Sequence, residues 1–235
     1  MAMLDVKNLS ISFGGLKAVD DFSITIEKGQ LYGLIGPNGA GKTTIFNLLT
    51  GVYKPDGGRI LLDGKDIRDV KLKDLRDEIG FVPQKGVLFS GTIASNLRFG
   101  KENATDAEIE KAAAIAQATE FIEAKDDKYE TAISQGGTNV SGGQKQRLAI
   151  ARAIAKDPKI FIFDDSFSAL DLKTDAALRK ALAENVKDST VIIVAQRIST
   201  ILHAEQILVL DDGKVVGKGT HEELLKNCKV YQEIA

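Results

Sequence analysis

Residues 36–44 read Gly-Pro-Asn-Gly-Ala-Gly-Lys-Thr-Thr, and this stretch decides the fold of the 235-residue chain. It follows the apolar run 31–35, which predicts a strand, and precedes the helical run 44–49. Glycines let the backbone wrap closely around a polyphosphate, so that several N–H groups and the start of the helix point at negative charge. The stretch therefore has the Walker A pattern in the strand–loop–helix context that this pattern requires.

This loop predicts ATP and Mg²⁺ as cofactors. We expect Lys42 to reach the β and γ phosphates, and Thr43 to bind Mg²⁺ through its hydroxyl. A purely structural turn would not need lysine and threonine after the last glycine. The loop residues expected to contact the nucleotide are Gly36, Asn38, Gly39, Ala40, Gly41, Lys42, Thr43 and Thr44.

The run 160–164, Ile-Phe-Ile-Phe-Asp, predicts the matching Walker B strand. Its four apolar residues suit a strand buried on both faces, and its last residue places a carboxylate at the C-terminal end, where open α/β sheets bind ligands. We expect Asp164 to be the Mg²⁺ partner through water. Because a strand that ends in aspartate is common, this pattern gains its weight from the loop upstream.

Short strand-like runs alternate with helical runs along the chain, which predicts a three-layer α/β fold. The runs 160–163 and 191–194 are apolar throughout, so they belong at the centre of a parallel sheet. Asp-Asp-Gly at 211–213 predicts a hairpin turn near an antiparallel edge. Between about residues 90 and 156 helical signals take over, which predicts an inserted helical subdomain. The expected strands are 23–27, 31–35, 59–62, 79–82, 160–163, 190–195, 206–210 and 214–217.

Two capping boxes predict where helices begin. Thr105 with Glu108 opens an alanine-rich helix, and Thr220 with Glu223 opens a helix near the C-terminus. His221 lies inside the second box, and a surface position at a helix start explains it better than a role as a ligand.

Length, charge and cysteine content limit the number of domains, the kinds of binding partner and the cellular compartment that we expect for this chain. The length is normal for one compact α/β domain, so we expect a single domain over 1–235. Lys plus Arg is 31 against 33 Asp plus Glu, which leaves no basic stripe for a nucleic acid. The single cysteine, Cys228, cannot form an internal disulfide, which suits the cytoplasm. No apolar run approaches the roughly 20 residues that span a bilayer, and no signal peptide opens the chain, so no direct membrane insertion is expected.

A second helix start resembles a known family. Residues 139–147, Asn-Val-Ser-Gly-Gly-Gln-Lys-Gln-Arg, look like the signature motif of ABC ATPases, and a helix that begins there offers another anion site. The nucleotide contacts expected from this motif are Ser141, Gly142, Gly143 and Gln144. The helix pattern places Leu148, Ala151, Ile154 and Ala155 on one apolar face, and Lys145, Gln146, Arg147 and Arg152 elsewhere.

The resemblance covers essentially the whole chain and implies the nucleotide-binding domain of an ABC transporter. The implied fold is α/β, with a P-loop NTPase (RecA-like) parallel-sheet core, an antiparallel β subdomain and the inserted helical subdomain. Phe13 takes the place of the adenine-stacking aromatic, with a core phenylalanine as the alternative, and Gln84 resembles the Q-loop glutamine that touches Mg²⁺ and senses the transmembrane partner. Residues 168–171 resemble the D-loop.

The implied partners are a second nucleotide-binding domain and the transmembrane subunits of a transporter. Two such domains would pack head to tail, so that each ATP lies between one Walker A loop and the opposite signature. ATP binding would close the dimer at the cytoplasmic face of the membrane, and hydrolysis would open it.

Two positions depart from the family pattern. Asp165 stands where the family has the glutamate that polarises the attacking water, and Gln196 stands where it has the switch histidine. Loss of a positioned general base typically slows a reaction ~10²- to 10⁴-fold. We therefore expect ATP binding with slow turnover, with catalytic roles at Lys42, Gln84, Asp165 and Gln196. A non-hydrolysing binding module is the alternative, and the exporter-like segment 84–100 argues against a DNA-repair or translation protein.

The two ends of the chain resemble different members of the family. Residues up to about 67 look like importer ATPases for branched-chain amino acids, which begin at a free methionine, whereas segments 84–100 and 135–147 look like exporter domains. This mismatch favours an engineered chimera, or another recombined sequence, joined between residues 64 and 78. Ordinary divergence within the superfamily is the alternative.

Overall fold

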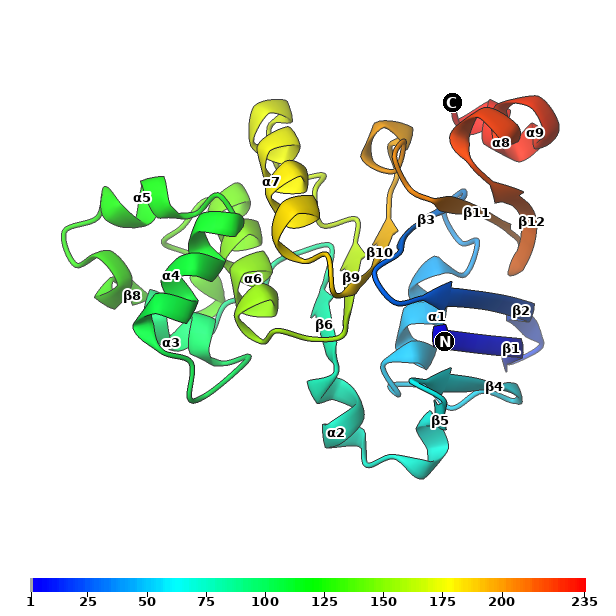
Figure 1. Ribbon diagram of the computed structural model, residues 1–235, viewed down its shortest axis with the longest axis horizontal. Helices are drawn as coiled ribbons and strands as arrows, with labels where there is room; N and C mark the ends of the chain where they lie inside the picture. The colour runs from blue at the N-terminus through cyan, green and yellow to red at the C-terminus, as the bar shows by residue number, and fades with distance from the viewer. Residues whose placement is uncertain (1) are drawn as a thin grey trace. The chain divides into compact units, whose positions relative to one another are not determined.

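The computed structural model describes residues 2–235, which form two compact units (Figure 1). The first unit contains the chain up to Ile79 together with residues 188–235, and the second contains residues 80–187. The glycine loop therefore belongs to the first unit, and the expected Walker B and signature residues belong to the second. That the whole chain acts as one domain stays a prediction.

An antiparallel sheet forms one part of the first unit. Its strands are β1 (Ala2–Phe13), β2 (Leu16–Glu27), β4 (Gly57–Leu62) and β5 (Lys65–Asp66), in the order β2-β1-β4-β5. The predicted antiparallel β subdomain is confirmed, but β1 and the first half of β2 were not predicted. Register shifts along the β1–β2 pair, one of them next to Asn8 with φ 50°, break the two-residue alternation that marks a strand in sequence.

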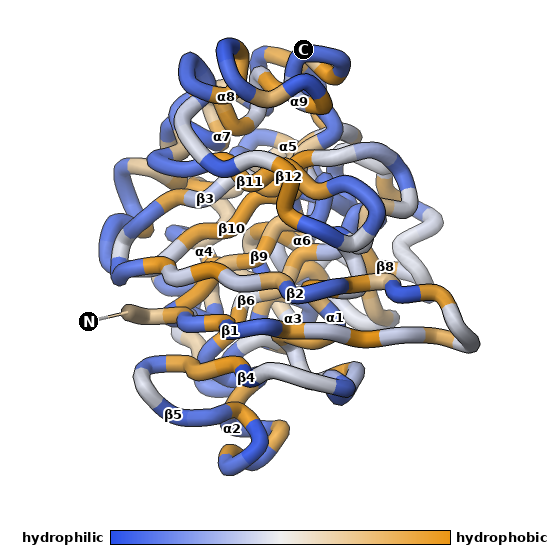
Figure 2. Tube along the Cα trace, turned by 90° about the vertical axis from the view of Figure 1, so that its right-hand side faces the viewer, coloured by the Kyte–Doolittle hydropathy of each residue, from blue (hydrophilic) through white to orange (hydrophobic). Residues whose placement is uncertain are grey.

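The other strands of the first unit run in the order β12-β11-β3-β10. β3 (Leu31–Ile35) pairs in parallel with β10 (Thr190–Val194) and with β11 (Gln206–Asp211), while β12 (Lys214–Gly219) pairs antiparallel with β11. Figure 2 shows the hydrophobic residues along β10 and β11. Asp212 and Gly213 both have positive φ, as a tight hairpin turn requires, which confirms the predicted turn and edge.

The helix that follows the glycine loop is α1 (Lys42–Leu49), whose Ile45, Phe46, Leu48 and Leu49 are buried. A small apolar cavity lies beneath this helix, and its lining includes Phe22, Ile45 and Ile192. The remaining helical elements of this unit are η1 (Ile67–Asp69), α2 (Leu72–Asp77), η4 (Ile198–Thr200), α8 (His221–Asn227) and α9 (Lys229–Ile234).

The second unit contains the predicted helical insertion. Its two longer strands, β6 (Ile79–Val82) and β9 (Ile160–Asp164), are neighbours, and β9 is buried along Ile160–Phe163 as expected. Helix α6 (Gly142–Ala155) packs against α3 (Ile93–Arg98) and α4 (Asp106–Ile115). The insertion also holds a two-stranded pair that was not predicted, β7 (Gly91–Thr92) with β8 (Ala132–Ile133). The other helical elements of the second unit are α5 (Thr119–Glu123), η2 (Lys128–Glu130), η3 (Gln135–Gly137) and, after β9, α7 (Leu172–Asn185).

Both predicted capping boxes are present. Thr105 caps α4 with Glu108, and Thr220 caps α8 with Glu223. His221 accordingly sits in the first turn of α8, where its Nδ1 lies 2.8 Å from the hydroxyl oxygen of buried Tyr231. Among residues 2–235, no helix combines the length and the apolar character needed to cross a membrane.

The α4 capping box should make folding sensitive to acid. Lys101 donates to Glu108 at 2.6 Å, and this bond, together with those from Thr105, lowers the pKa of Glu108 from 4.5 to about 2. Because the folded pKa is depressed, its stabilisation is complete above pH 4.5 and disappears as the pH falls towards 2. We expect Glu108→Gln to lower the urea midpoint at pH 7 and to lower it much less at pH 2.5, where most of the stabilisation has already been lost. An equal loss at both pH values would contradict the prediction, and Glu102→Gln, at an exposed glutamate, is the control.

Candidate nucleotide-binding site

The glycine loop joins the end of β3 to the start of α1. Gly41 has a φ of +94°, and a Cβ atom there would lie 2.3 Å from the carbonyl oxygen of Ala18, so only glycine fits. Gly41 is also the N-cap of α1, which has neither a side-chain cap nor an acidic residue in its first turn. No carboxylate of the helix itself therefore neutralises its positive end, and the site favours an anion.

Lys42 folds back over this loop. Its Nζ donates to the carbonyl oxygen of Gly36 at 2.6 Å and to that of Pro37 at 2.7 Å. The ammonium is thus held over the loop by two main-chain carbonyls. Both acceptors are neutral, and a charge-assisted bond to a phosphate oxygen is roughly twice as strong, so a bound polyphosphate would compete well for the lysine.

The two residues expected to bind Mg²⁺ from the Walker motifs carry oxygen donors and lie in different units. Thr43 is exposed on the first turn of α1, and Asp164 is half-buried at the end of β9. Among residues 2–235, no group of three or more His, Cys, Asp and Glu side chains could hold a metal ion. Mg²⁺ usually binds one or two protein oxygens and takes its other ligands from phosphates and water, so the Thr43 hydroxyl and the Asp164 carboxylate are each a type of ligand that suits this ion.

Phe13, the expected adenine-stacking residue, ends β1 and is 44% exposed. Its ring meets that of Tyr53 edge-on, with the centroids 5.3 Å apart. The alternative interpretation as a core phenylalanine is therefore wrong. An exposed ring with a second aromatic beside it leaves a face free for a planar ligand.

The structure brings Gln84 and Asp165 together. Nε2 of Gln84 donates to Oδ2 of Asp165 at 3.0 Å, and Asp165 is buried, directly after β9. Its backbone is left-handed, with a φ of 47°. Ser168 donates its hydroxyl to the carbonyl oxygen of Asp165 at 2.8 Å, which ties the D-loop to this turn. One oxygen of the shortened carboxylate is thus already engaged by the glutamine.

The signature residues begin α6 as predicted. Ser141 is the N-cap: its hydroxyl accepts from the Gln144 amide at 3.2 Å, while the Gln144 side chain accepts from the Ser141 amide at 3.1 Å. The first turn contains no acidic residue, and its first two residues are Gly142 and Gly143. This positive helix end suits an anion, with the Ser141 hydroxyl already used as a cap.

The last two predicted residues lie at the ends of other elements. Gln196 follows β10 in the first unit and is exposed. Asp171, at the end of the D-loop, is the N-cap of α7 and accepts from the amide and the hydroxyl of Thr174 at 2.9 and 2.7 Å. These bonds lower the pKa of Asp171, so it stays ionised as a cap.

The expected division of α6 into apolar and polar faces is only partly correct. Leu148, Ala151 and Ala155 are buried, but Ile154 is only half-buried, and Gln146 is 1% exposed although it was placed away from the apolar face. Arg152 also points into the unit, where burial lowers its pKa to about 10. The apolar run 148–151 already signals a helix covered on several sides, and polar residues within such a helix need partners.

Comparisons with known proteins agree with one another. A sequence model of the family described as ABC transporter matches residues 19–168. An uncharacterised ABC transporter ATP-binding protein of Mycobacterium tuberculosis is 44% identical over 92% of this chain and 38% of its own length. The beta-(1→2)glucan export ATP-binding/permease protein NdvA of Rhodopseudomonas palustris is 44% identical over 99% of this chain and 39% of its own length.

A solved structure gives the same result. The structure of a bacterial Atm1-family ABC exporter with ATP bound matches 98% of this chain and 41% of that chain, with a TM-score of 0.94 and 38% identity. The chain thus spans about two fifths of the length of the proteins it matches.

Proposed function

We propose a function from the premise that this chain belongs to the ABC transporter family: it binds ATP with Mg²⁺ and hydrolyses the ATP slowly. Its fold is that of an ABC ATPase domain, with the P-loop NTPase architecture, and it is similar to exporter ATPase domains. The observation that carries the proposal is the loop before α1, where Lys42 lies over a helix end that has no acidic cap.

Each site residue has a part in this proposal. Residues 36–44 bind the phosphates, Phe13 stacks on the adenine, and Ser141–Gln144 bind the nucleotide of a partner domain. Thr43, Gln84 and Asp164 act on Mg²⁺, which would neutralise phosphate charge during transfer. Asp165 and Gln196 orient the attacking water poorly, because one side chain is too short and the other cannot carry a proton.

The partners follow from the longer relatives. We propose that two such domains close on ATP and that their closure drives transmembrane segments, at the cytoplasmic face of the membrane. The glucan export protein named above combines ATP-binding and permease parts, which supports a transmembrane partner for this chain. An intact signature with altered Asp165 and Gln196 resembles the subunit of a heterodimeric exporter that supplies the impaired site, so its signature would complete the active site of the partner.

A non-hydrolysing ATP-binding module is the second candidate. The bond from Gln84 to Asp165 favours it, because an aspartate held by that amide has one oxygen fewer to offer a water molecule. Phosphate release separates the two functions. We expect the purified chain to release phosphate from Mg-ATP slowly but above the Lys42→Ala blank. A rate equal to the blank would support the non-hydrolysing module.

ATP-dependent dimerisation tests the shared part of both candidates. Sedimentation of the purified chain should show monomers without nucleotide and a dimer fraction with millimolar Mg-ATP. Slow turnover should prolong the dimer, since hydrolysis is what opens it. A chain that binds ATP, as judged by calorimetry, but never dimerises would contradict the proposed role of Ser141–Gln144.

The mixed origin of the sequence is a separate hypothesis. Exporter-type relatives align with up to 99% of the chain, so their alignments cross the region 64–78. This favours ordinary divergence within the superfamily over a junction between two sequences. The chimera requires residues 1–64 to be more similar to importer ATPases and residues 78–235 to exporter domains. One relative that leads over both segments when they are compared separately would refute it.

A further inference from the structure

The segment that follows β6 is bound to the signature helix through its backbone. Gln146, on α6, accepts from the Gly86 amide at 2.8 Å and donates to the carbonyl oxygen of Pro83 at 3.0 Å. The buried Gln146 side chain thus holds the main chain both before and after Gln84. A Cβ atom on Gly86 would lie 2.8 Å from the carbonyl oxygen of Lys145, so the segment runs directly against the helix backbone.

Arg152 holds the far end of the same segment. Its guanidinium donates to the carbonyl oxygen of Val87 at 2.9 Å, and to the main-chain and side-chain oxygens of Asn96 at 2.9 and 2.7 Å. Asn96 in turn accepts from the Phe89 amide at 2.9 Å and donates to the Phe89 carbonyl at 2.8 Å. The guanidinium carbon also lies 4.9 Å from the centre of the Phe89 ring.

These contacts leave the segment 83–89 little freedom to move independently of α6. Main-chain groups at Pro83, Gly86 and Val87 are bonded to side chains of α6, and each would become an unsatisfied group if its partner left. Gln84 lies between the first two, and its amide reaches Asp165. A continuous chain of contacts therefore runs from α6, through the segment, to the carboxylate after β9.

We propose that Gln146 and Arg152 are positioning residues: they fix the segment 83–89 on the signature helix, so that the place of Gln84 against Asp165 follows the position of α6. The catalytic consequence rests on the proposed ATPase function, whereas the attachment itself does not. The start of α6 is proposed to bind the nucleotide of a partner domain. The position of α6 would thereby also determine where the water-activating residues of its own chain lie.

The first test replaces Gln146 with methionine, which has a similar volume but forms neither hydrogen bond. Amide exchange at Gly86, followed by NMR or mass spectrometry, should become roughly tenfold faster, as expected when one buried hydrogen bond is lost. The kcat for ATP should fall about tenfold, because Gln84 is no longer held in place. The dissociation constant for Mg-ATP should stay within about twofold, since the contacts of the loop 36–44 are untouched.

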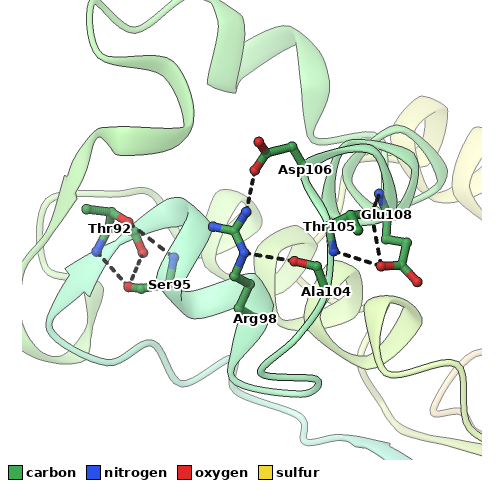
Figure 3. Close-up of polar contacts among 7 residues, drawn as sticks. All are labelled: Thr92, Ser95, Arg98, Ala104, Thr105, Asp106 and Glu108. Carbon is green, nitrogen blue, oxygen red and sulfur yellow. Dashed lines mark hydrogen bonds and ion pairs between the residues drawn. The ribbon is translucent and has the colours of Figure 1, made fainter.

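The second test uses a matched pair of arginines. Arg152→Lys keeps the charge but loses the planar fork that reaches Val87 and Asn96 together. Arg98→Lys is the control: Arg98 lies on α3 in the same unit, and its guanidinium donates to the Ala104 carbonyl at 3.0 Å and to Asp106 (Figure 3), away from the segment. Only Arg152→Lys should speed exchange at Phe89 and lower kcat. This pair also serves if Gln146→Met does not fold.

The readouts separate this proposal from the function on which it rests. Unchanged exchange at both Gly86 and Phe89 would overturn the attachment, whatever the ATPase rate. Faster exchange with an unchanged kcat would overturn the coupling between α6 and Gln84. A dissociation constant for Mg-ATP that rises as much as kcat falls would also overturn it, because Gln146 and Arg152 would then only stabilise the fold. Should the unaltered chain bind no Mg-ATP in calorimetry, the proposed function fails, while the exchange data still decide whether Gln146 and Arg152 fix the segment.

Discussion

Asp165→Glu combined with Gln196→His should raise the steady-state rate of ATP hydrolysis ~100-fold or more, the effect expected when a positioned general base is restored. The longer side chain would move the carboxylate one methylene away from the position in which Gln84 now holds it. Histidine at 196 would add a group that can donate to the γ-phosphate and also carry a proton. Coupled-enzyme measurement of phosphate or ADP release at saturating Mg-ATP gives the rate.

The backbone conformation at residue 165 should make the Asp165→Glu substitution destabilising. Asp165 has a φ of 47°, and the left-handed conformation costs an ordinary residue ~1 kcal/mol or more, a cost that aspartate bears better than glutamate. Asp157→Glu is the matched control, because Asp157 is exposed and also left-handed, with a φ of 54°. Both variants should lose stability to the left-handed backbone, and only the first should gain activity. An unchanged rate in a folded double variant would show that neither residue limits turnover.

The parts of the fold that could be predicted are those in which one physical constraint dominates. β3 and β6 were predicted with their observed bounds, and β9 to within one residue, because buried strands need apolar residues at nearly every position. The glycine loop was equally clear, since its shape depends on local backbone conformations that only certain residues adopt. β1 escaped prediction because its register shifts interrupt the alternation on which strand prediction depends.

The site was predictable in its residues but not in its contacts. A motif indicates that Gln84 and Asp165 matter, whereas their mutual bond depends on how β6 and β9 bring two loops together, 81 residues apart in sequence. Gln146 and Arg152 were missed for a related reason. A polar side chain on a helix is usually assigned to solvent, and only the tertiary structure shows that loop carbonyls and amides have taken the place of water.

Lys42→Ala should weaken Mg-ATP binding about 100-fold, the amount expected from losing one or two charge-assisted hydrogen bonds to the phosphates. Titration calorimetry of the folded chain measures this directly, because the unaltered protein should give a saturable heat with millimolar nucleotide. Lys54→Ala, at an exposed lysine in the same unit, controls for the loss of one positive charge. Equal affinities in the three proteins would refute the role of the loop.

Part of the Lys42 effect should act through the loop itself. In the structure the ammonium bonds to Gly36 and Pro37, so alanine would leave both carbonyls without this donor and loosen the loop before any nucleotide arrives. Lys42→Arg separates the two contributions, because it keeps a positive charge while replacing a compact ammonium with a planar group that fits this turn poorly. If phosphate attraction dominates, arginine should recover part of the affinity. If the shape of the loop dominates, arginine should bind no better than alanine, and the thermal midpoint of both variants should fall together.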